Sequence, residues 1–531
     1  MSSPLPRAEL LLRLQQPQTW DLVVIGGGAT GLGVALDAAV RGFSVALVES
    51  GDFAQGTSSR ATKLAHGGVR YLAQGDIGLV REALHERGAI LANAPHVAQR
   101  LAFVMPGYHW WERGFYGAGL KAYDALAGRQ GLGGTEWLSS RRTLELLPGV
   151  QPRGLWGGVR YWDGQFDDAR LALLLARTAA ARGALVVNHC AATGLLLDEA
   201  VSVSGVHVRC VESGLQATLR SRCVVNATGV WVDAVRDMDQ AAGTAPRPPM
   251  VAPSQGVHLV VDRAFMPGSH ALLVPKTADG RVLFAVPWLG KTILGTTDTP
   301  RPDLAREPEP NAHEVAFILG ESARYLARAP QRSDVRSVWV GLRPLVRPPK
   351  NEAGGAPTKQ LSREHTVMVA RSGLITVTGG KWTTYRSMAE DVLDHAMTRG
   401  LLARRPGGVT ARLPLLGAAP GRPMSEPPGE HLYGSEAAVL RSLPGADRWL
   451  WRDAESGKPG LSEAMVRFAA RHEMARSVED VLARRCRLLF LDAAESARHA
   501  DTVAAILAEE LGRDIDTDAF KQLAAQYQRL P

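Results

Sequence analysis

The residues whose types and spacing point most directly to chemistry lie near the start of the chain, in the run GGGATG at 26–31. Gly26, Gly28 and Gly31 have the GxGxxG spacing. In this spacing the first glycine permits a tight turn, the second lets the backbone approach a pyrophosphate, and the third lets helix and strand pack closely. The free N–H groups and the dipole at the start of a following helix favour an anion. The run therefore predicts a site for the phosphates of a dinucleotide.

Three predicted elements would hold this run in place. We expect an apolar strand at 22–25, a helix at 31–41 and a second strand at 45–48, which together make a β-α-β unit. Glu49 ends the second strand, and a carboxylate there can accept hydrogen bonds from both ribose hydroxyls of an adenosine. An ordinary turn between strand and helix is the alternative explanation of the glycines.

Two later turns favour FAD over a nicotinamide cofactor. The run NATG ends at Gly229 after the apolar strand CVV, and Gly379-Gly380-Lys381 follows the strand LITVT and leads into a helix. A helix N-terminus there can stabilise negative charge on a reduced flavin ring. Each turn alone could be a plain connection, but a nicotinamide enzyme would not need three of them. The pattern predicts FAD.

The overall composition narrows the class of protein. At 531 residues the chain is too long for one compact core, so two or three domains are expected. The net charge of +8 suits nucleic acid, an anionic membrane or an anionic substrate, or is only a solvated surface. Without zinc spacing, an RNA-binding motif or a long basic run, no nucleic-acid partner is expected. Four scattered cysteines predict no disulfide framework and no metal site, and suit a reducing compartment.

The hydropathy pattern predicts no membrane-spanning segment. The N-terminal residues lack the apolar core and the small-residue cleavage site of a signal peptide. No apolar run reaches the length of about 18 residues that a spanning helix needs. Any membrane contact is therefore expected to be peripheral.

The pattern of elements predicts a multidomain protein that combines the α/β and α+β classes. A discontinuous Rossmann-like domain would bind FAD, an inserted antiparallel β-sheet (cap) domain would bind substrate, and a Pro- and Gly-rich linker would lead to an all-helical C-terminal domain. The expected bounds are 19–97, 154–240 and 339–398 for the FAD-binding domain, 98–153 and 241–338 for the cap domain, 399–430 for the linker, and 431–531 for the C-terminal domain.

Several longer motifs occur in an order that identifies a family. They are TSSRATKLAHGGVRYL (57–72), DDARL (167–171), NATGVW (226–231), PSQGVHLVV (253–261), LGTTDTP (294–300), GLRPLV (341–346), GGKWTTYRSMAED (379–391) and ARSVEDVLARR (475–485). They resemble the FAD-dependent, respiratory glycerol-3-phosphate dehydrogenases, among the D-amino-acid-oxidase-like flavoproteins. The chain looks closer to the mitochondrial branch, although it has no EF-hand calcium loop. Gln255 replaces the lysine of the bacterial pattern, which puts any role of that lysine in doubt.

The resemblance implies a substrate, sn-glycerol 3-phosphate, which is a dianion that cations with hydrogen-bonding partners can bind. The substrate-binding residues implied by the matched motifs are Arg70, Tyr71, Arg343, Lys381 and Thr384. The implied FAD contacts are Gly26, Gly28, Gly31, Glu49, Ser58, Ser59, Lys63, His66, Gly67, Gly229, Gly379, Gly380 and Lys381.

Oxidation of the C2 alcohol needs hydride transfer to flavin N5 and a base for the hydroxyl proton. His258 is the first candidate for that base because the pKa of an ordinary histidine is near neutral, and His66 is the second. Arg343 could instead polarise the oxygen. Residues 296–298 either close the substrate pocket or form a turn.

The resemblance also implies an electron acceptor, membrane quinone. The segment 107–128 predicts a peripheral docking surface for the inner face of the cytoplasmic membrane, with core packing as the alternative. Its aromatic, apolar and basic residues are Trp110, Trp111, Phe115, Tyr116, Leu120, Tyr123, Arg113 and Lys121. The helical C-terminal domain has no assigned chemistry, and a homodimer, partner docking or packing are open roles for it.

Three alternative functions remain from the sequence. The first is a glycerol-3-phosphate oxidase of the same fold that reduces oxygen to peroxide. The second is an amine or amino-acid oxidase, which needs an arginine for a carboxylate but explains several phosphate-suited cations less well. The third is non-catalytic, an FAD-binding scaffold, or an RNA-modifying flavoprotein.

Overall fold

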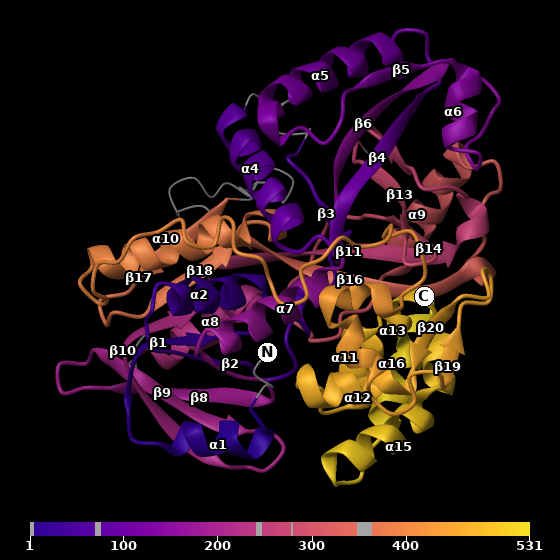
Figure 1. Ribbon diagram of the computed structural model, residues 1–531. Coiled ribbons are helices and arrows are strands. Elements are labelled where there is room, and N and C mark those ends of the chain that lie inside the picture. The colour runs from indigo at the N-terminus through magenta and orange to yellow at the C-terminus, as the bar shows by residue number, and fades with distance from the viewer. Residues whose placement is uncertain (1–4, 69–75, 241–246, 278–279, 348–363) are drawn as a thin grey trace.

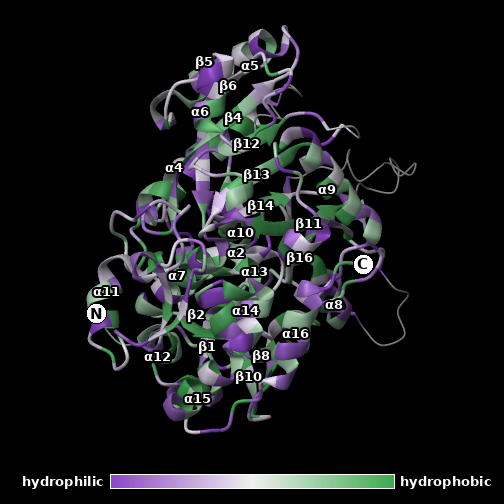
Figure 2. Ribbon diagram, turned by 90° about the vertical axis from the view of Figure 1, so that its right-hand side faces the viewer, coloured by the Kyte–Doolittle hydropathy of each residue, from purple (hydrophilic) through white to green (hydrophobic). Residues whose placement is uncertain are grey.

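The computed structural model describes residues 5–68, 76–240, 247–277, 280–347 and 364–531. Two sheets and a C-terminal group of helices make up these parts of the chain (Figure 1). Hydrophobic residues are concentrated in the strands of both sheets (Figure 2). The expected combination of a Rossmann-like domain, a second, mostly antiparallel sheet and a mainly helical C-terminal domain is confirmed.

The first sheet has eight strands, and its central strands are parallel. Its main order is β17-β18-β10-β1-β2-β7, with β8 and β9 extending it as an antiparallel meander beside β10. Strands β2 and β7 and the second half of β1, residues 22–25, are runs of Val, Ile, Leu and Ala that are buried on both faces, as expected for parallel strands covered by helices. The strands are β1 (Thr19–Ile25), β2 (Val45–Val48), β7 (Leu185–Val187), β8 (Cys190–Leu197), β9 (Val203–Cys210), β10 (Gln216–Asn226), β17 (His365–Val369) and β18 (Ile375–Gly379).

Helices cover both faces of this sheet. Leu22 and Val24 point into a core that is shared with α2, α7 and α10, while Val23 and Ile25 point into the opposite core with α1 and α8. This alternation follows from the two-residue period of a strand. The helices are α1 (Arg7–Gln15), α2 (Ala29–Val40), α7 (Asp168–Ala181), α8 (Val232–Met238) and α10 (Tyr385–Thr398). The β-α-β unit predicted from the glycine run is confirmed as β1, α2 and β2.

The second sheet has ten strands that are mostly antiparallel, in the order β15-β11-β14-β13-β12-β4-β6-β3, with β16 beside β11 and β5 beside β6. The strands are β3 (Leu64–Ala65), β4 (Ala98–Gly107), β5 (Glu136–Leu138), β6 (Gly157–Phe166), β11 (Val251–Asp262), β12 (Ala271–Val274), β13 (Leu283–Trp288), β14 (Lys291–Gly295), β15 (Thr299–Pro300) and β16 (Val335–Val346). The helices associated with this sheet are α4 (Ile77–Asn93), α5 (Glu112–Ala127), α6 (Ser140–Leu146) and α9 (Ala312–Tyr325).

The two sheets divide the chain at points that differ from the predicted bounds. The predictions assign residues from 154 and from 339 onward to the FAD-binding domain, yet β6 and all of β16 pair within the second sheet. The sequence of the glycine- and aromatic-rich β6 and of the long β16 has no turn signal that marks the division between the two domains. Strand pairing over long sequence distances decides the division.

The C-terminal domain is mainly helical but not wholly so. A hairpin of β19 (Trp449–Arg452) and β20 (Pro459–Ser462) interrupts it, which corrects the expectation of an all-helical domain. The segment expected as a linker packs against the rest of the protein, because Leu415 lies in the core of the first sheet and Met424 in the core of the C-terminal domain. The helices are α11 (Ala437–Arg441), α12 (Glu463–His472), α13 (Leu488–Leu491), α14 (Ala493–Arg498), α15 (Ala500–Leu511) and α16 (Asp518–Gln528), with a π-helix, η10 (Asp480–Arg485).

Buried ion pairs join the C-terminal domain to α7 of the first sheet. The guanidinium of Arg177 donates two hydrogen bonds of 2.7 Å to the carboxylate of Glu436, and Arg170 donates one of 2.9 Å to Glu473. All four side chains are buried. Each charge therefore depends on its partner, because an unpaired charge in a buried environment is strongly destabilising.

We predict that Arg177→Met lowers the free energy of unfolding by about 3–5 kcal/mol, since it leaves the Glu436 carboxylate buried without its partner. The double variant Arg177→Met/Glu436→Gln should recover part of this loss because no uncompensated charge remains. Denaturant unfolding of both variants beside the wild-type protein measures the difference. A loss below about 1 kcal/mol, the value typical of an exposed pair, would contradict this account.

Candidate cofactor and substrate site

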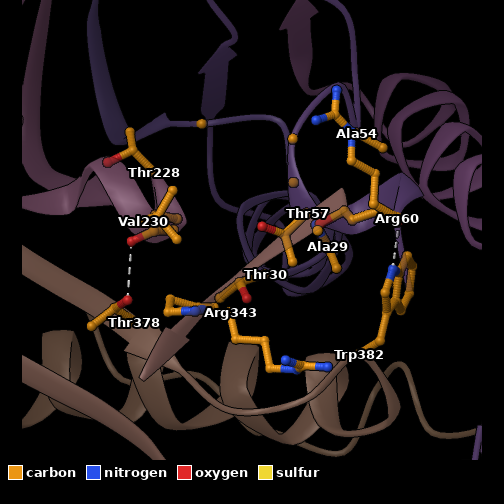
Figure 3. Close-up of a pocket in the computed structure, with 18 of the residues that line it drawn as sticks. Ala29, Thr30, Ala54, Thr57, Arg60, Thr228, Val230, Arg343, Thr378 and Trp382 are labelled. Carbon is orange, nitrogen blue, oxygen red and sulfur yellow. Dashed lines mark hydrogen bonds between the residues drawn. The ribbon is translucent and has the colours of Figure 1, made fainter. Parts of the chain in front are cut away.

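The main cavity lies where the carboxyl ends of the parallel strands meet. Its volume is about 550 Å³, and the turns after β1, β10 and β18 line one part of it, while β11 and β16 of the second sheet line another. Figure 3 shows side chains from these separate segments gathered around one space, among them Thr57, Thr228 and Arg343. The crevice outside the carboxyl ends of the strands is where open α/β sheets bind ligands.

The first glycine turn is too tight for any other residue at two of its positions. Gly26 has a φ of +112°, and a Cβ there would lie 2.6 Å from the carbonyl oxygen of Ala227. A Cβ on Gly31 would lie 2.0 Å from the carbonyl oxygen of Gly26. The backbone of the turn and the first turn of α2 can therefore approach a ligand directly, as a diphosphate at a helix N-terminus requires.

Glu49 connects the second strand to this turn. Its carboxylate accepts hydrogen bonds from the backbone N–H of Gly27 at 2.7 Å and of Gly51 at 2.8 Å, and the residue lines the cavity. It therefore shapes the glycine turn, and a carboxylate at the end of this strand is also where a ribose would be bound.

The segment Thr57–Lys63 forms one wall of the cavity and bridges the two sheets. The hydroxyl of Ser58 accepts a hydrogen bond of 2.9 Å from the N–H of Ala29 in the first turn of α2, and the indole of Trp382 donates one of 2.8 Å to the Ser58 carbonyl. On the other side, the hydroxyl of Thr62 lies 2.9 Å from Nε2 of His258 on β11.

His258 is a buried, neutral histidine at the cavity wall. Its ring stacks on Trp339, with ring centroids 5.3 Å apart. Burial, with the nearby charges of Lys63 and Arg343, holds the pKa of His258 well below the ordinary histidine value. The ring therefore remains uncharged at neutral pH and keeps one nitrogen lone pair available.

Arg343 enters the cavity from β16 in a fixed orientation. Its guanidinium donates to the carbonyl of Thr297 at 2.9 Å and to Asp298 Oδ1 at 3.2 Å, and Thr296 Oγ1 lies 3.3 Å from it. Residues 296–298 thus hold the arginine, and Thr296 also lines the cavity. Lys381, after the third glycine turn, lines the same cavity.

The structure brings most of the predicted site residues to this cavity and places others elsewhere. Five of the predicted residues do not line it: Gly31, Ser59, Lys63, Gly67 and Thr384. Gly31 packs within the turn, the Thr384 hydroxyl donates to the Lys381 carbonyl, and the Gly67 N–H donates to the hydroxyl of Tyr123. Arg70 and Tyr71 fall outside the described residues. Those that line it are Gly26, Gly28, Glu49, Ser58, His66, Gly229, His258, Arg343, Gly379, Gly380 and Lys381.

Lys63 has a different environment from the one expected of a cofactor ligand. Its ammonium group is fully buried and lies 2.7 Å from the carboxylate of Asp168. Burial lowers the pKa of Lys63 to about 7, although Asp168 acts in the opposite direction.

Sequence reasoning missed several residues that line the cavity: Arg60, Thr62, Trp231, Gly256 and Arg306. Arg60 and Thr62 lie inside a matched motif, so the motif itself was the available signal. Arg306 follows no glycine turn, and only the path of the connection after β15 brings it there.

The aromatic segment expected to face a membrane divides between surface and core. The side chains of Trp110 and Phe115 are 78% and 67% exposed, and Trp111 is also exposed. Leu120 and Tyr123 are buried instead, which corrects their assignment to the surface. In the described part of the chain, no helix has both the length and the apolar character that crossing a membrane requires.

Comparisons with known proteins agree with this geometry. A family model described as FAD dependent oxidoreductase matches residues 21–386, and one described as the C-terminal domain of alpha-glycerophosphate oxidase matches residues 408–518. The mitochondrial glycerol-3-phosphate dehydrogenase of Arabidopsis thaliana is 41% identical over 92% of this chain and 82% of its own. That of Homo sapiens is 40% identical over 98% of this chain and 74% of its own.

A solved structure extends the agreement to three dimensions. The glycerol-3-phosphate dehydrogenase from Bacillus halodurans, complexed with FAD, superposes with a TM-score of 0.76 at 29% identity, over 100% of this chain and 99% of its own. An L-amino acid deaminase from Proteus vulgaris, at 16% identity and a TM-score of 0.52, shares the fold alone. The family match spans well over half of the chain, the cofactor is FAD, and the chain belongs to the FAD-dependent glycerol-3-phosphate dehydrogenases.

Proposed function

We propose that the protein oxidises sn-glycerol 3-phosphate to dihydroxyacetone phosphate and passes the electrons to membrane quinone. The observation that carries the proposal is the meeting of Arg343, Lys381 and the neutral His258 in the cavity that the three turns of the first sheet also line. Two cations suit the phosphate dianion, and an uncharged histidine suits removal of a hydroxyl proton.

The cavity fits FAD on three counts. The glycine turn leaves backbone exposed at a helix N-terminus for the diphosphate, Glu49 stands where a ribose would lie, and the turn at Gly379 and Gly380 opens on the same space. When bound, FAD supplies the acceptor of the C2 hydride at flavin N5. The protein's own residues bind the phosphate, orient the alcohol and take up its proton.

His258 is the residue we assign to that proton. The hydroxyl of Thr62 interacts with Nε2, and Nδ1 is buried without a hydrogen-bond partner among the described residues. Its low pKa means that His258 is not already protonated when substrate binds, so an acceptor lone pair is present. His66 lines the same cavity and is the second candidate for this role.

The exposed aromatic residues before and at the start of α5 support peripheral docking on the inner face of the cytoplasmic membrane. Trp110, Trp111 and Phe115 offer interfacial aromatic area, and Arg113 and Lys121 are exposed on the same helix for anionic lipid. Docking there would give the reduced flavin access to quinone in the bilayer.

The acceptor is tested by measuring dihydroxyacetone phosphate with and without a soluble quinone analogue, in air, while peroxide is followed. We expect product formation that depends on the quinone analogue, with little peroxide. Peroxide produced in equal amount to the product, at a rate that the quinone does not change, would identify an oxidase and contradict the proposed acceptor.

We predict that Arg343→Ala raises KM for sn-glycerol 3-phosphate about 10- to 100-fold, since a charge-assisted hydrogen bond contributes about 1.5–3 kcal/mol. Arg336→Ala is the matched control, because Arg336 also lies on β16 but pairs with Asp262, away from the cavity. Steady-state kinetics of both variants make the comparison. A fall in kcat at unchanged KM would assign Arg343 to the C2 oxygen instead, and unchanged kinetics would remove it from the site.

A further inference from the structure

A buried cluster of charges lies directly behind the cavity wall formed by Thr57–Lys63. Lys63, Asp168 and Arg487 are all fully buried. The Lys63 ammonium donates to the Ser59 carbonyl at 2.6 Å and to Asp168 Oδ2 at 2.7 Å. The Arg487 guanidinium donates to the same Ser59 carbonyl at 2.7 Å and to Asp168 Oδ1 at 3.2 Å. Two cations thus converge on one backbone carbonyl of the wall, and the Asp168 carboxylate pairs with both of them.

Three parts of the molecule supply this cluster. Trp288 and Trp339 of the second sheet and Phe490 of the C-terminal domain surround the Lys63 ammonium, each with its ring centroid 5.3 Å away. Arg487 belongs to the C-terminal domain and Asp168 begins α7. Burying charges in this way costs desolvation free energy that their attraction often fails to recover, so a gain in stability does not explain the cluster well.

The cluster connects to His258 by two short paths. Asp168 Oδ2 accepts a hydrogen bond of 3.1 Å from the N–H of Ala61, which fixes the backbone immediately before Thr62. The Lys63 ammonium lies over the Trp339 ring, and the same ring stacks on that of His258 with an angle of 17° between the two planes. Two groups orient the His258 ring, and both are tied to the cluster. Thr62 directly follows Ala61, whose N–H donates to Asp168, and Trp339 contacts Lys63.

We propose that Thr62 is a positioning residue for His258, and that the Lys63–Asp168–Arg487 cluster, completed by the C-terminal domain, holds Thr62 in place. When Nε2 carries the proton it donates to the Thr62 hydroxyl, and Nδ1, which is buried and has no partner among the described residues, keeps its lone pair. The hydroxyl can accept this bond both before and after the ring is protonated. This inference rests on the role proposed for His258, and it gives the C-terminal domain a part in catalysis.

Thr62→Val tests the first half, because valine keeps the shape of threonine and removes the hydroxyl. The holoenzyme is mixed anaerobically with sn-glycerol 3-phosphate, and the loss of oxidised flavin absorbance is followed. We expect the limiting rate of flavin reduction to fall about 10- to 100-fold, part of what general-base catalysis contributes. The concentration for half-maximal rate, FAD content and melting temperature should change little.

Thr62→Ser is the matched control, since it restores the hydroxyl without the methyl group. We expect its rate to return to within a few-fold of the wild-type rate. A Thr62→Val variant that reduces its flavin at the wild-type rate would overturn the positioning role. So would a serine variant as slow as the valine variant, because the effect would then come from packing.

Arg487→Met tests the second half, because it removes the charge contributed by the C-terminal domain and keeps a long apolar side chain. We expect a lower limiting rate of flavin reduction and an altered visible flavin spectrum, since Ser59 loses one of its two donors. Arg177→Met is the control, because it weakens attachment of the same domain at Glu436 without contacting Thr57–Lys63. Equal rates in Arg487→Met and the wild-type protein would overturn this half.

The wild-type control separates the inference from the function on which it rests. If sn-glycerol 3-phosphate does not reduce the flavin of the wild-type holoenzyme, the proposed function fails. If the wild-type flavin is reduced and both Thr62→Val and Arg487→Met match its rate, the function stands and the positioning role alone fails.

Discussion

The parallel register of four strands is the constraint on which the site depends. Val48 of β2, Ile25 of β1, Asn226 of β10 and Thr376 of β18 are paired in one line across the first sheet. Strands that are parallel and in register must turn at the same edge, so three sequence-distant turns open on one cavity. The backbone ladder continues into the glycine turn, where the N–H of Gly26 bonds to the carbonyl of Val48 at 2.9 Å.

In the proposed site, that edge supplies only the residues that would bind the cofactor. His258 and Arg343 come from β11 and β16, adjacent strands of the second sheet in which Ser254 is paired with Arg343. The segment Thr57–Lys63 joins the two halves, because its hydroxyls contact α2 on one side and His258 on the other. Arg487 of the C-terminal domain donates a hydrogen bond to the carbonyl of Ser59 in this segment. The domain of the first sheet, the second sheet and the C-terminal domain thus all contact residues 57–63.

Local pattern was sufficient for part of this arrangement. The apolar strand, the glycine spacing and Glu49 are contiguous, so their geometry follows from short-range rules and agrees with the structure. Leu120 and Tyr123 were misplaced because the aromatic residues of α5 continue from its exposed face, with Phe115, onto its buried face, and residue type alone does not show where one face ends. The contact of Thr62 with His258 and the burial of Lys63 arise from pairings between residues that are far apart in sequence. Neither spacing nor residue type signals such contacts before the sheets are assembled.

We infer that the cavity holds FAD and sn-glycerol 3-phosphate together for a direct redox reaction. The most direct test is an anaerobic titration of the purified holoenzyme with sn-glycerol 3-phosphate, followed by the flavin absorbance, with glycerol as the control that lacks the phosphate. We expect bleaching of the oxidised flavin by the phosphorylated substrate, with dihydroxyacetone phosphate formed in equal amount, and none by glycerol at the same concentration. An oxidised spectrum that survives excess sn-glycerol 3-phosphate would contradict it.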